Sequence, residues 1–514
     1  MSSHIEYTLV PDLPKLGWLA KIDHSNKVFV YHGPKIECHP EWMVEGVWNG
    51  EFESGNFHDS IVFYGSGVRI SNGKIYLSTS ITNQTRLIYC KIKNEILVSN
   101  SLILMLAFTN AEIDEKHDYE RECTSVLRGT KSYDRRFRVK HSSIDWFYQV
   151  FYENMVVSDG NISFESRFHF YNVTTYKDYI DKLENVLNGL KSNYQSPMRQ
   201  YSVVPFTMLS SGYDSTAVTC LVKNIGVKNC YTSRQSNSIL PGFMEQAKDD
   251  GTHVAIKLGM TVSYLDPVAK HIEEEDELFF LARGARAGIG TVLNESIMYP
   301  MTKHIESQCE VGVVFRGDHG DTIWETDVPD KCLVDDIIRS DECGTALFEL
   351  RLKSGVIPIA VPYIFAENIK KIHSIILSDS MKPWRTFNSY DRPIARRIIE
   401  SSGIERGMFA KRKKAMVSSY RYPDNRHLRK EFRTFLKRKY GVGRIFIFLY
   451  LTSNAIVSYL KHILSFTLGI HFYNARAVHF FKKFDMAFIM WNWAIEVLAT
   501  KYRKVFQDAT PRNN

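Results

Sequence analysis

A loop of small and polar residues carries the clearest chemical signal in the sequence. Residues 209–215 read Leu-Ser-Ser-Gly-Tyr-Asp-Ser and stand between an apolar strand and a helix. Small residues at such a turn let backbone N–H groups approach phosphate oxygens at the positive end of the helix dipole. The hydroxyls of Ser210 and Ser215 can add donors, and Asp214 can bind Mg²⁺ beside a phosphate chain. No Gly-Lys-Ser/Thr sequence follows, so this predicted phosphate site is not a Walker loop.

The elements that would position this loop alternate along the chain. An apolar strand is expected over 201–209 and a helix over about 216–224, with a second strand ending near 233. A helix around 243–258 and an apolar strand at 311–315 follow. Strand and helix in this order predict an α/β fold built from parallel βαβ units with right-handed crossovers.

The region before this pattern is β-rich. Short runs of Val, Ile, Tyr and Phe are broken at close intervals by Gly, Asn and Ser, which is typical of a meander or sandwich. These runs lie at 27–31, 60–64, 74–78, 86–92 and 95–98.

Two further patterns set the expected limits of the domains. Apolar residues recur at helical spacing between 176 and 194, and the chain from about 430 to its end reads as helical, basic and aromatic. We therefore predict three domains, over residues 1–170, 171–430 and 431–514.

The phosphate loop resembles the Ser-Gly-Gly-x-Asp-Ser signature of ATP pyrophosphatases, with Ser211 where the first Gly is usual. Residues 311–324 are similar to a Ser-Gly-x-Gly-x-Asp-Glu-Leu-Phe segment of the asparagine synthetase family. Gly317 and Asp321 match that segment. The positions expected to hold Ser, Gly and Glu are occupied by Arg316, His319 and Thr322.

Three other stretches resemble the same family, in the family's order. The first is an acidic helix before Leu-Gly, represented here by Glu245, Ala247, Asp249, Asp250 and Leu258-Gly259. Residues 360–363, Ala-Val-Pro-Tyr, are similar to an Arg-Val-Pro-Phe-Leu-Asp segment but lack the Arg and the Asp. Residues 411–416 are similar to an Arg-x-Lys segment of the family. In this alignment Lys413 occupies the position of the family's catalytic lysine.

The resemblance implies a fold, a reaction and a set of site residues. The fold would be a parallel-sheet ATP-pyrophosphatase domain of the adenine nucleotide alpha hydrolase-like kind. A degenerate, β-rich Ntn-hydrolase-like domain would precede it, and a helical tail would follow. The reaction would be ATP-dependent, AMP-forming activation of a carboxylate, followed by amide formation, with ATP and Mg²⁺ required. The residues implied for ATP and pyrophosphate are Leu209, Ser210, Ser211, Gly212, Asp214, Ser215, Ser233 and Gly317. Asp214 and Asp321 would bind the metal, and Lys413 would stabilise developing charge.

The N-terminal region resembles the glutamine amidotransferase domain of these synthetases at 48–52, Trp-Asn-Gly-Glu-Phe, and at 85–106. That glutaminase uses a cysteine at position 2, because a thiolate is the better nucleophile near neutral pH. Here the chain begins Met1-Ser2-Ser3. We therefore expect a structural front domain and nitrogen from ammonia or an amine, with a sugar acid or peptide as an alternative to aspartate.

Two alternatives belong to other functional classes. The replacements at 211, 316 and 322 leave open a pseudoenzyme or regulatory nucleotide-binding protein. Another pyrophosphatase-loop enzyme, such as one that modifies tRNA, would often carry a Cys pair or zinc cluster, and neither spacing occurs in the sequence.

The composition of the chain indicates the class of protein and its expected location in the cell. Of 514 residues 44% are hydrophobic and 24% charged, as in soluble globular proteins, and 65 Lys and Arg exceed 57 Asp and Glu by eight. Eight scattered cysteines and an N-terminus without a secretory pattern predict a cytoplasmic protein. The longest apolar stretch, 445–460, is shorter than a spanning helix and predicts a buried or interfacial one. Peripheral membrane contact through the tail is the alternative. No nucleic acid partner is expected. The sequence does not indicate an oligomeric state.

Overall fold

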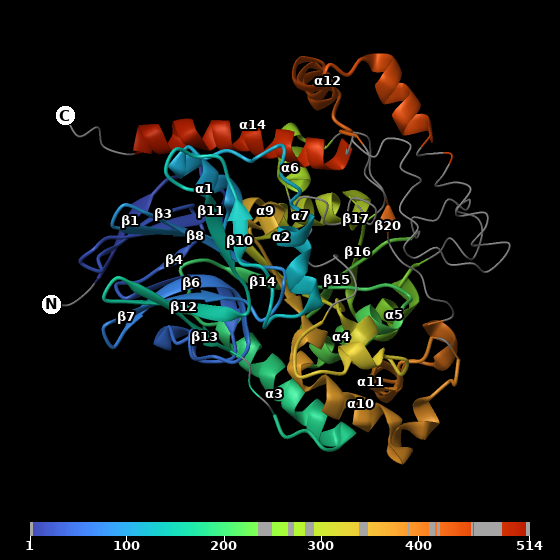
Figure 1. The fold of residues 1–514 in the computed structure, drawn as a ribbon. Helices are drawn as coiled ribbons and strands as arrows, with labels where there is room; N and C mark the ends of the chain where they lie inside the picture. The colour runs from blue at the N-terminus through green and yellow to red at the C-terminus, as the bar shows by residue number, and fades with distance from the viewer. Residues whose placement is uncertain are drawn as a thin grey trace.

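A computed structural model gives the fold of the chain (Figure 1). It describes residues 4–167, 169, 171–234, 249–265, 272–282, 292–293, 295–338, 348–388, 390–410, 417–418, 422–453, 456 and 486–509.

The N-terminal region is a pair of β-sheets with a shared apolar core. The seven-stranded sheet has the order β1 (Ile5–Leu9), β3 (Val28–His32), β2 (Trp18–Ile22), β9 (Glu95–Ser99), β8 (Leu87–Ile92), β11 (Trp146–Val150) and β10 (Arg136–Arg138). The six-stranded sheet has the order β13 (Asn161–Ser166), β12 (Glu153–Ser158), β7 (Lys74–Thr79), β6 (Phe63–Ser71), β5 (Trp42–Trp48) and β4 (Glu37–Cys38). Val30 and Val98 of the first sheet share one hydrophobic cluster with Val68 and Leu77 of the second. The predicted β-rich region is confirmed.

The expected strands agree with these bounds with one clear difference. The strand expected at 60–64 begins only at Phe63. The Ser60 hydroxyl donates to the carbonyl of Val62 over 2.9 Å, so these residues form a turn before the strand. Two helices, α1 (Leu102–Thr109) and α2 (Glu120–Thr124), complete this region.

The middle of the chain forms a five-stranded sheet in which every strand pair is parallel. Its order is β16 (Thr261–Tyr264), β15 (Asn229–Thr232), β14 (Val203–Met208), β18 (Val311–Arg316) and β19 (Val356–Ala360). All six residues of β18 are buried, as expected for a parallel strand covered on both faces. The α/β fold predicted from alternating strands and helices is confirmed.

Helices surround this sheet, and several of them connect its strands (Figure 1). They are α3 (Tyr176–Tyr194), α4 (Tyr213–Asn224), α5 (Thr252–Lys257), α6 (Glu274–Leu281), α7 (Glu295–Gln308), α8 (Gly320–Ile323), α9 (Phe348–Ser354), α10 (Ile369–Leu377) and α11 (Pro393–Ser401). A two-stranded ribbon pairs β17 (Val292–Leu293) with β20 (Val417–Ser418). Of the helix expected around 243–258, residues 243–248 lie outside the described part of the chain.

The N-terminal and middle regions are joined by buried polar contacts. Both guanidinium Nη atoms of Arg351 donate to the carboxylate of Glu45, each over 2.8 Å. The Ser101 hydroxyl donates to Glu349 over 2.6 Å. Since one hydrophobic cluster also includes residues from both sides of position 170, the two regions share a core.

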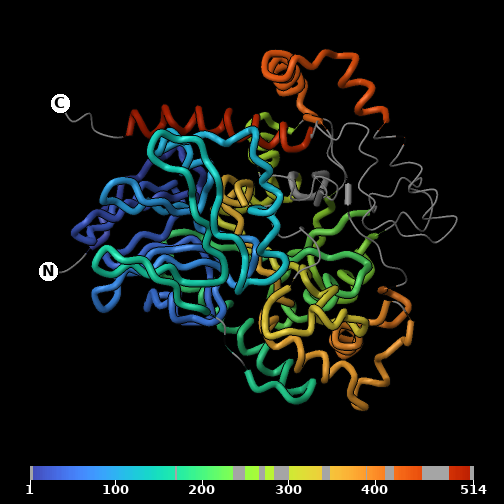
Figure 2. Tube along the Cα trace, viewed as in Figure 1, coloured from blue at the N-terminus to red at the C-terminus, as the bar shows by residue number. Residues whose placement is uncertain are grey.

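The described C-terminal region is helical, as expected, and returns to the N-terminal one. It contains α12 (Arg426–Tyr440) and α14 (Met486–Ala509). Figure 2 shows α14, in red, running beside the N-terminal part. The rings of Phe506 and Phe108 lie 5.2 Å apart, and Arg503 donates to the carbonyl of Ala111 over 2.9 Å. Among the helices of the described residues, none combines the length and apolar character needed to cross a membrane.

Candidate active site

The two predicted motif loops follow adjacent strands. The 209–215 loop follows β14, and residues 317–321 follow β18, its neighbour in the sheet. From β14 the chain moves through α4 to β15 on one side, whereas β18 and β19 lie on the other side. This is the switch point of the sheet, where the carboxyl ends of parallel strands leave a crevice for ligands.

Gly317 of the second motif and the nearby Gly320 bring these two loops into direct contact. A Cβ at Gly317 would lie 2.7 Å from the carbonyl carbon of Asp214 and 2.7 Å from the nitrogen of Ser215. A Cβ at Gly320 would lie 2.7 Å from Cγ of Asp214. Only residues without a side chain permit this approach, so both positions have a packing reason to be Gly.

Hydroxyl groups hold the 209–215 loop in shape. The Oγ atoms of Ser210 and Ser215 lie 2.7 Å apart, and the N–H of Gly212 donates to Ser210 Oγ over 3.1 Å. Gly212 is extended, with φ −80° and ψ 176°, and acts as the N-cap of α4 without a capping side chain. The helix therefore begins at Tyr213, three residues earlier than expected, and its first turn includes Asp214 and Ser215.

The residue that departs from the glycine pattern has its own partner. The hydroxyl and the N–H of Ser211 both donate to Asp249 Oδ1, over 2.7 Å and 3.1 Å. Its carbonyl accepts from the N–H of Ala410 over 2.7 Å. The serine side chain is therefore directed toward a buried carboxylate.

Asp214 has two carboxylate oxygens in different surroundings. Its Oδ2 forms an ion pair with Arg392. Its Oδ1 is buried and has no hydrogen-bond partner among the described residues. Burial raises the pKa of Asp214 to about 6; Arg392 opposes this rise, and Asp321 adds to it. A carboxylate with one unoccupied buried oxygen is suited to a cation.

Arg392 bridges Asp214 and Glu325, and its pKa is also affected by the charge of Asp321. Its Nε lies 3.2 Å from Glu325 Oε2. Burial would lower the pKa of Arg392, but the charges of Asp214, Asp321 and Glu325 outweigh it and raise the pKa. Arg392 therefore stays charged beside the loop. The local sequence marks Arg392 only by its position directly before Pro393, the first residue of α11, so it was not among the predicted site residues.

The carboxylates present suit a magnesium ion shared with phosphate. The described residues include no group of three or more His, Cys, Asp or Glu that could bind a metal by itself. Mg²⁺ beside nucleotides, however, commonly takes one or two carboxylates together with phosphate oxygens. Asp214, with its unoccupied Oδ1, and Asp321, close enough to affect the pKa of Asp214, meet that requirement.

The unusual residues of the second motif also have partners. Arg316 pairs with Asp318 over 3.2 Å, and Asp318 accepts from Gln84 Nε2 over 2.5 Å. The ring of His319 stacks on Tyr363 at 4.6 Å, with φ of 74° at His319. Gln84 belongs to the N-terminal region, so that region contacts the second motif loop.

Of the remaining predicted site residues, the structure describes Leu209 and Ser233 but not Lys413. The N–H of buried Leu209 donates to the carbonyl of Tyr231 over 2.8 Å, and Ser233 is buried just beyond β15. Both lie directly after the adjacent strands β14 and β15. Lys413 lies outside the described residues, as do Glu245 and Ala247. Ala410, which bonds Ser211, is three residues before Lys413.

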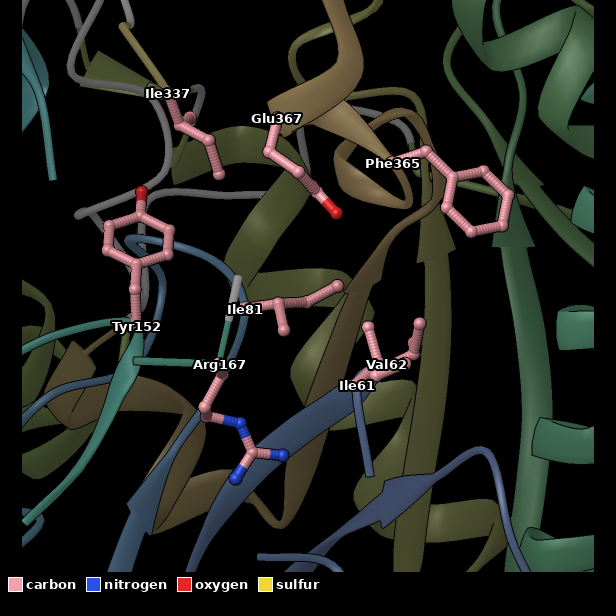
Figure 3. A pocket seen from close by; sticks show the side chains of 8 residues that line it. All are labelled: Ile61, Val62, Ile81, Tyr152, Arg167, Ile337, Phe365 and Glu367. Atoms are coloured by element: carbon pink, nitrogen blue, oxygen red, sulfur yellow. The ribbon is translucent and has the colours of Figure 1, made fainter. Parts of the chain in front are cut away.

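A separate small cavity lies elsewhere (Figure 3), and its volume is about 20 Å³, room for about one water. None of the predicted site residues lines it; its walls are Ile61, Val62, Ile81, Tyr152, Arg167, Ile337, Phe365 and Glu367. Burial raises the pKa of Glu367 to about 7 and lowers that of Arg167 to about 9. The cavity is too small for a nucleotide.

Cys38, His39 and the other described cysteines have surroundings typical of structural rather than catalytic residues. Burial raises the pKa of the Cys38 thiol to about 12, and nearby Glu37 adds to the rise, so Cys38 is a poor nucleophile at neutral pH. The neighbouring His39 stacks on Trp42 at 3.7 Å. The seven described cysteines form no disulfide.

Comparison with protein-family models and with curated proteins gives no match to this chain. The described residues define an α/β protein with a five-stranded parallel sheet. Its switch point carries a small-residue loop and the carboxylate of Asp214, whose buried Oδ1 has no hydrogen-bond partner among those residues.

Proposed function

We propose that the chain is an AMP-forming carbon–nitrogen ligase of the asparagine synthetase kind. It would bind Mg·ATP at the switch point, activate a carboxylate and then form an amide. The observation that carries the proposal is the contact between two motif loops about 100 residues apart in sequence, at Gly317, Gly320 and Asp214. The Oδ1 atom of Asp214, which has no described partner, lies at that contact.

The proposed roles follow from the positions of the residues. Ser210, Gly212 and Ser215 would hold the phosphates, using hydroxyls and the uncapped N–H groups of α4. Ser211, predicted with them, would border the phosphates and hold the loop in shape through its two bonds to Asp249. Leu209 and Ser233 would lie beside adenine, Gly317 would let the two loops close on the phosphates, and Asp214 with Asp321 would bind Mg²⁺. Arg392 would orient Asp214 and offset negative charge.

The reaction would proceed in two displacements. An oxygen of the substrate carboxylate would attack the α-phosphorus, and the bond to pyrophosphate would break. The nitrogen of ammonia or an amine would then attack the activated carbonyl and release AMP. Lys413 would neutralise charge on departing pyrophosphate and on the tetrahedral intermediate. A bound divalent ion would add positive charge at the phosphates.

The partners of this proposal are a small-molecule carboxylate and ammonia or an amine, with a sugar acid or peptide as the alternative carboxylate. The half-buried thiol of Cys38 has a raised pKa and does not offer an internal glutaminase nucleophile. A cytoplasmic location accords with seven described cysteines that form no disulfide.

Two ion pairs favour a second candidate function, a regulatory nucleotide-binding protein without turnover. Arg392 already occupies Oδ2 of Asp214, and Arg316, at a position where the family has Ser, is paired with Asp318. Such a protein would bind Mg·ATP but release neither AMP nor pyrophosphate.

Product analysis separates these functions. Purified protein would be incubated with Mg·ATP, ammonium and, in turn, aspartate, uronic acids and short peptides. The ligase predicts carboxylate-dependent AMP and pyrophosphate, lost in Asp214→Ala and Lys413→Ala but kept in a Lys177→Glu surface control. ADP and phosphate as products would contradict the ligase. Mg·ATP binding without turnover on any of these acids would favour the regulatory protein.

A further inference from the structure

The helix α12 and the turn after it carry most of the net charge of the chain. Residues 426–444 contain eight Lys and Arg and a single acidic residue, Glu431, which gives a formal charge of +7. The entire chain has a formal charge of +8, so the other residues together are nearly neutral. Such concentration on one element is an electrostatic footprint for an anionic partner.

The two sides of α12 differ in character. One side packs into the protein, and the ring of Phe432 lies 5.0 Å from Trp493 of α14. Its buried residues are Leu428, Phe432, Phe435 and Leu436. Away from that side, intervals of four, three and four residues place Arg426, Lys430, Arg433 and Lys437 in one stripe. These four form no ion pair with any acidic residue that the structure describes.

The helical residues 444–453 that follow present an apolar face to solvent. Ile447 is buried, but the exposed fractions of Ile445, Phe448 and Leu449 are 78%, 67% and 55%. Ile456 is also 55% exposed and continues the same face. In soluble proteins, a contiguous exposed patch of large apolar residues marks an interaction site.

We propose that this pair of helices docks on an anionic lipid bilayer surface. The stripe Arg426, Lys430, Arg433 and Lys437 would contact phosphate headgroups, and the face of Ile445, Phe448 and Leu449 would enter the interface. An interfacial helix combines basic residues with a large apolar face in this way. Both helices lie at the top of the view, away from the two sheets of the N-terminal region (Figure 1).

Charge and chemistry favour lipid over the other occupants. A nucleic acid would match the basic stripe but offers no apolar phase for Ile445 and Leu449. A second copy of the chain would bring +7 against +7 at the same patch, which opposes association at low salt. A bilayer with anionic headgroups satisfies both features. This inference does not depend on the proposed ligase activity.

Vesicle co-sedimentation of the full chain tests the proposal. Vesicles of phosphatidylcholine with about one third phosphatidylglycerol should bind at least roughly ten times more protein than pure phosphatidylcholine, because each basic residue near an anionic surface adds to binding. Binding should weaken as NaCl rises toward 0.5 M, roughly, because added salt screens the attraction. Equal binding to both vesicle types, or to neither, would overturn the proposal.

Two sets of variants separate the contributions. Replacing Lys430, Arg433 and Lys437 by Glu, and separately Phe448 and Leu449 by Ser, should each reduce binding about tenfold or more. The matched control replaces the exposed Lys177, Lys223 and Lys228 by Glu and should bind as the natural chain does. Loss of RNA binding in the charge variants, with no vesicle binding in the natural chain, would assign the patch to nucleic acid and refute lipid docking. Mg·ATP binding, measured in parallel, reports the proposed function separately.

Discussion

At the scale of single residues, the charge of Asp214 decides whether the proposed site can bind a cation. Burial raises its pKa to about 6, and this is the net result after Arg392 acts in the opposite direction. Above pH 6 the carboxylate is charged and can bind a cation. Below pH 6 it takes up a proton and loses that capacity.

Mg·ATP affinity is therefore expected to fall as pH decreases through 6. At pH 5 about one tenth of Asp214 would be ionised, so the contribution of this carboxylate would weaken about tenfold relative to pH 7.5. Calorimetric titration with a non-hydrolysable ATP analogue would measure the dissociation constant across this range. Because the nucleotide itself titrates, the Asp214→Asn variant is the reference; parallel pH profiles for the two proteins would contradict this role.

Glu367 offers a stability test that is independent of catalysis. Burial raises its pKa from 4.5 to about 7, so the folded state keeps the proton to higher pH than the unfolded state. Stability is then fully retained below pH 4.5 and is lost as pH rises through 7. Glu367→Gln, which imitates the protonated form, should be more stable than the natural chain by about 3 kcal/mol at pH 8 and about equal to it at about pH 4. Urea denaturation at both pH values gives the comparison, and an equal effect at the two would contradict it.

Some residues of the candidate site could be predicted from the sequence, and others could not. Ser210, Asp214 and Gly317 belong to local motifs, and a short window of sequence was enough to select them. Arg392 was missed because its significance comes from three acidic groups that folding places around it. The partner of Ser211, Asp249, likewise lies 38 residues away in the chain.

At the scale of elements, the tight contact between the loops after β14 and β18 is the feature most sensitive to substitution. Gly317→Ala would place a methyl group 2.7 Å from backbone atoms of Asp214 and Ser215, neither of which belongs to a flexible side chain. We expect a loss of stability of about 1–3 kcal/mol and a larger loss of nucleotide affinity, because the loop must move.

The matched control for that change is Gly407→Ala, since a Cβ at Gly407 would meet no atom within 4 Å. Urea denaturation and Mg·ATP titration of the two variants give the comparison. If Gly317→Ala binds Mg·ATP as tightly as Gly407→Ala does, the loop contact is not part of the nucleotide site.

Elements with a complete local pattern were predicted best. The helix α3 spans Tyr176–Tyr194 as expected, because its apolar spacing is regular and Thr175 caps it by accepting from Asp178 N–H. The start of α4 was missed by three residues, since Tyr213, Asp214 and Ser215 are neutral in helix propensity and the turn geometry of Gly212 decides the boundary.

At the scale of the whole molecule, the buried pair of Glu45 and Arg351 joins the N-terminal region to the α/β region. Arg351→Met would leave Glu45 buried without its cation, at a cost of about 3–5 kcal/mol. The double variant Glu45→Leu with Arg351→Met should recover much of that loss. Urea denaturation followed by tryptophan fluorescence and circular dichroism should give one coincident transition. Two separate transitions in the natural chain would contradict a shared core.

Sequence patterns indicated the classes of the three regions but not how they pack. The β-rich, α/β and helical regions each have a periodicity that can be read locally. That α14 lies against α1, about 400 residues earlier, and that one apolar cluster crosses position 170, depend on contacts that no local pattern encodes.

The central claim is that Mg·ATP binds across the loops that follow β14 and β18. Hydrogen–deuterium exchange with and without Mg·ATP tests it most directly, because it locates the nucleotide before any substrate is known. We predict slower exchange in peptides covering 209–216 and 316–323, and no such protection in Asp214→Ala. Protection elsewhere, for example only around Arg167 and Glu367, or none at saturating Mg·ATP, would contradict the claim.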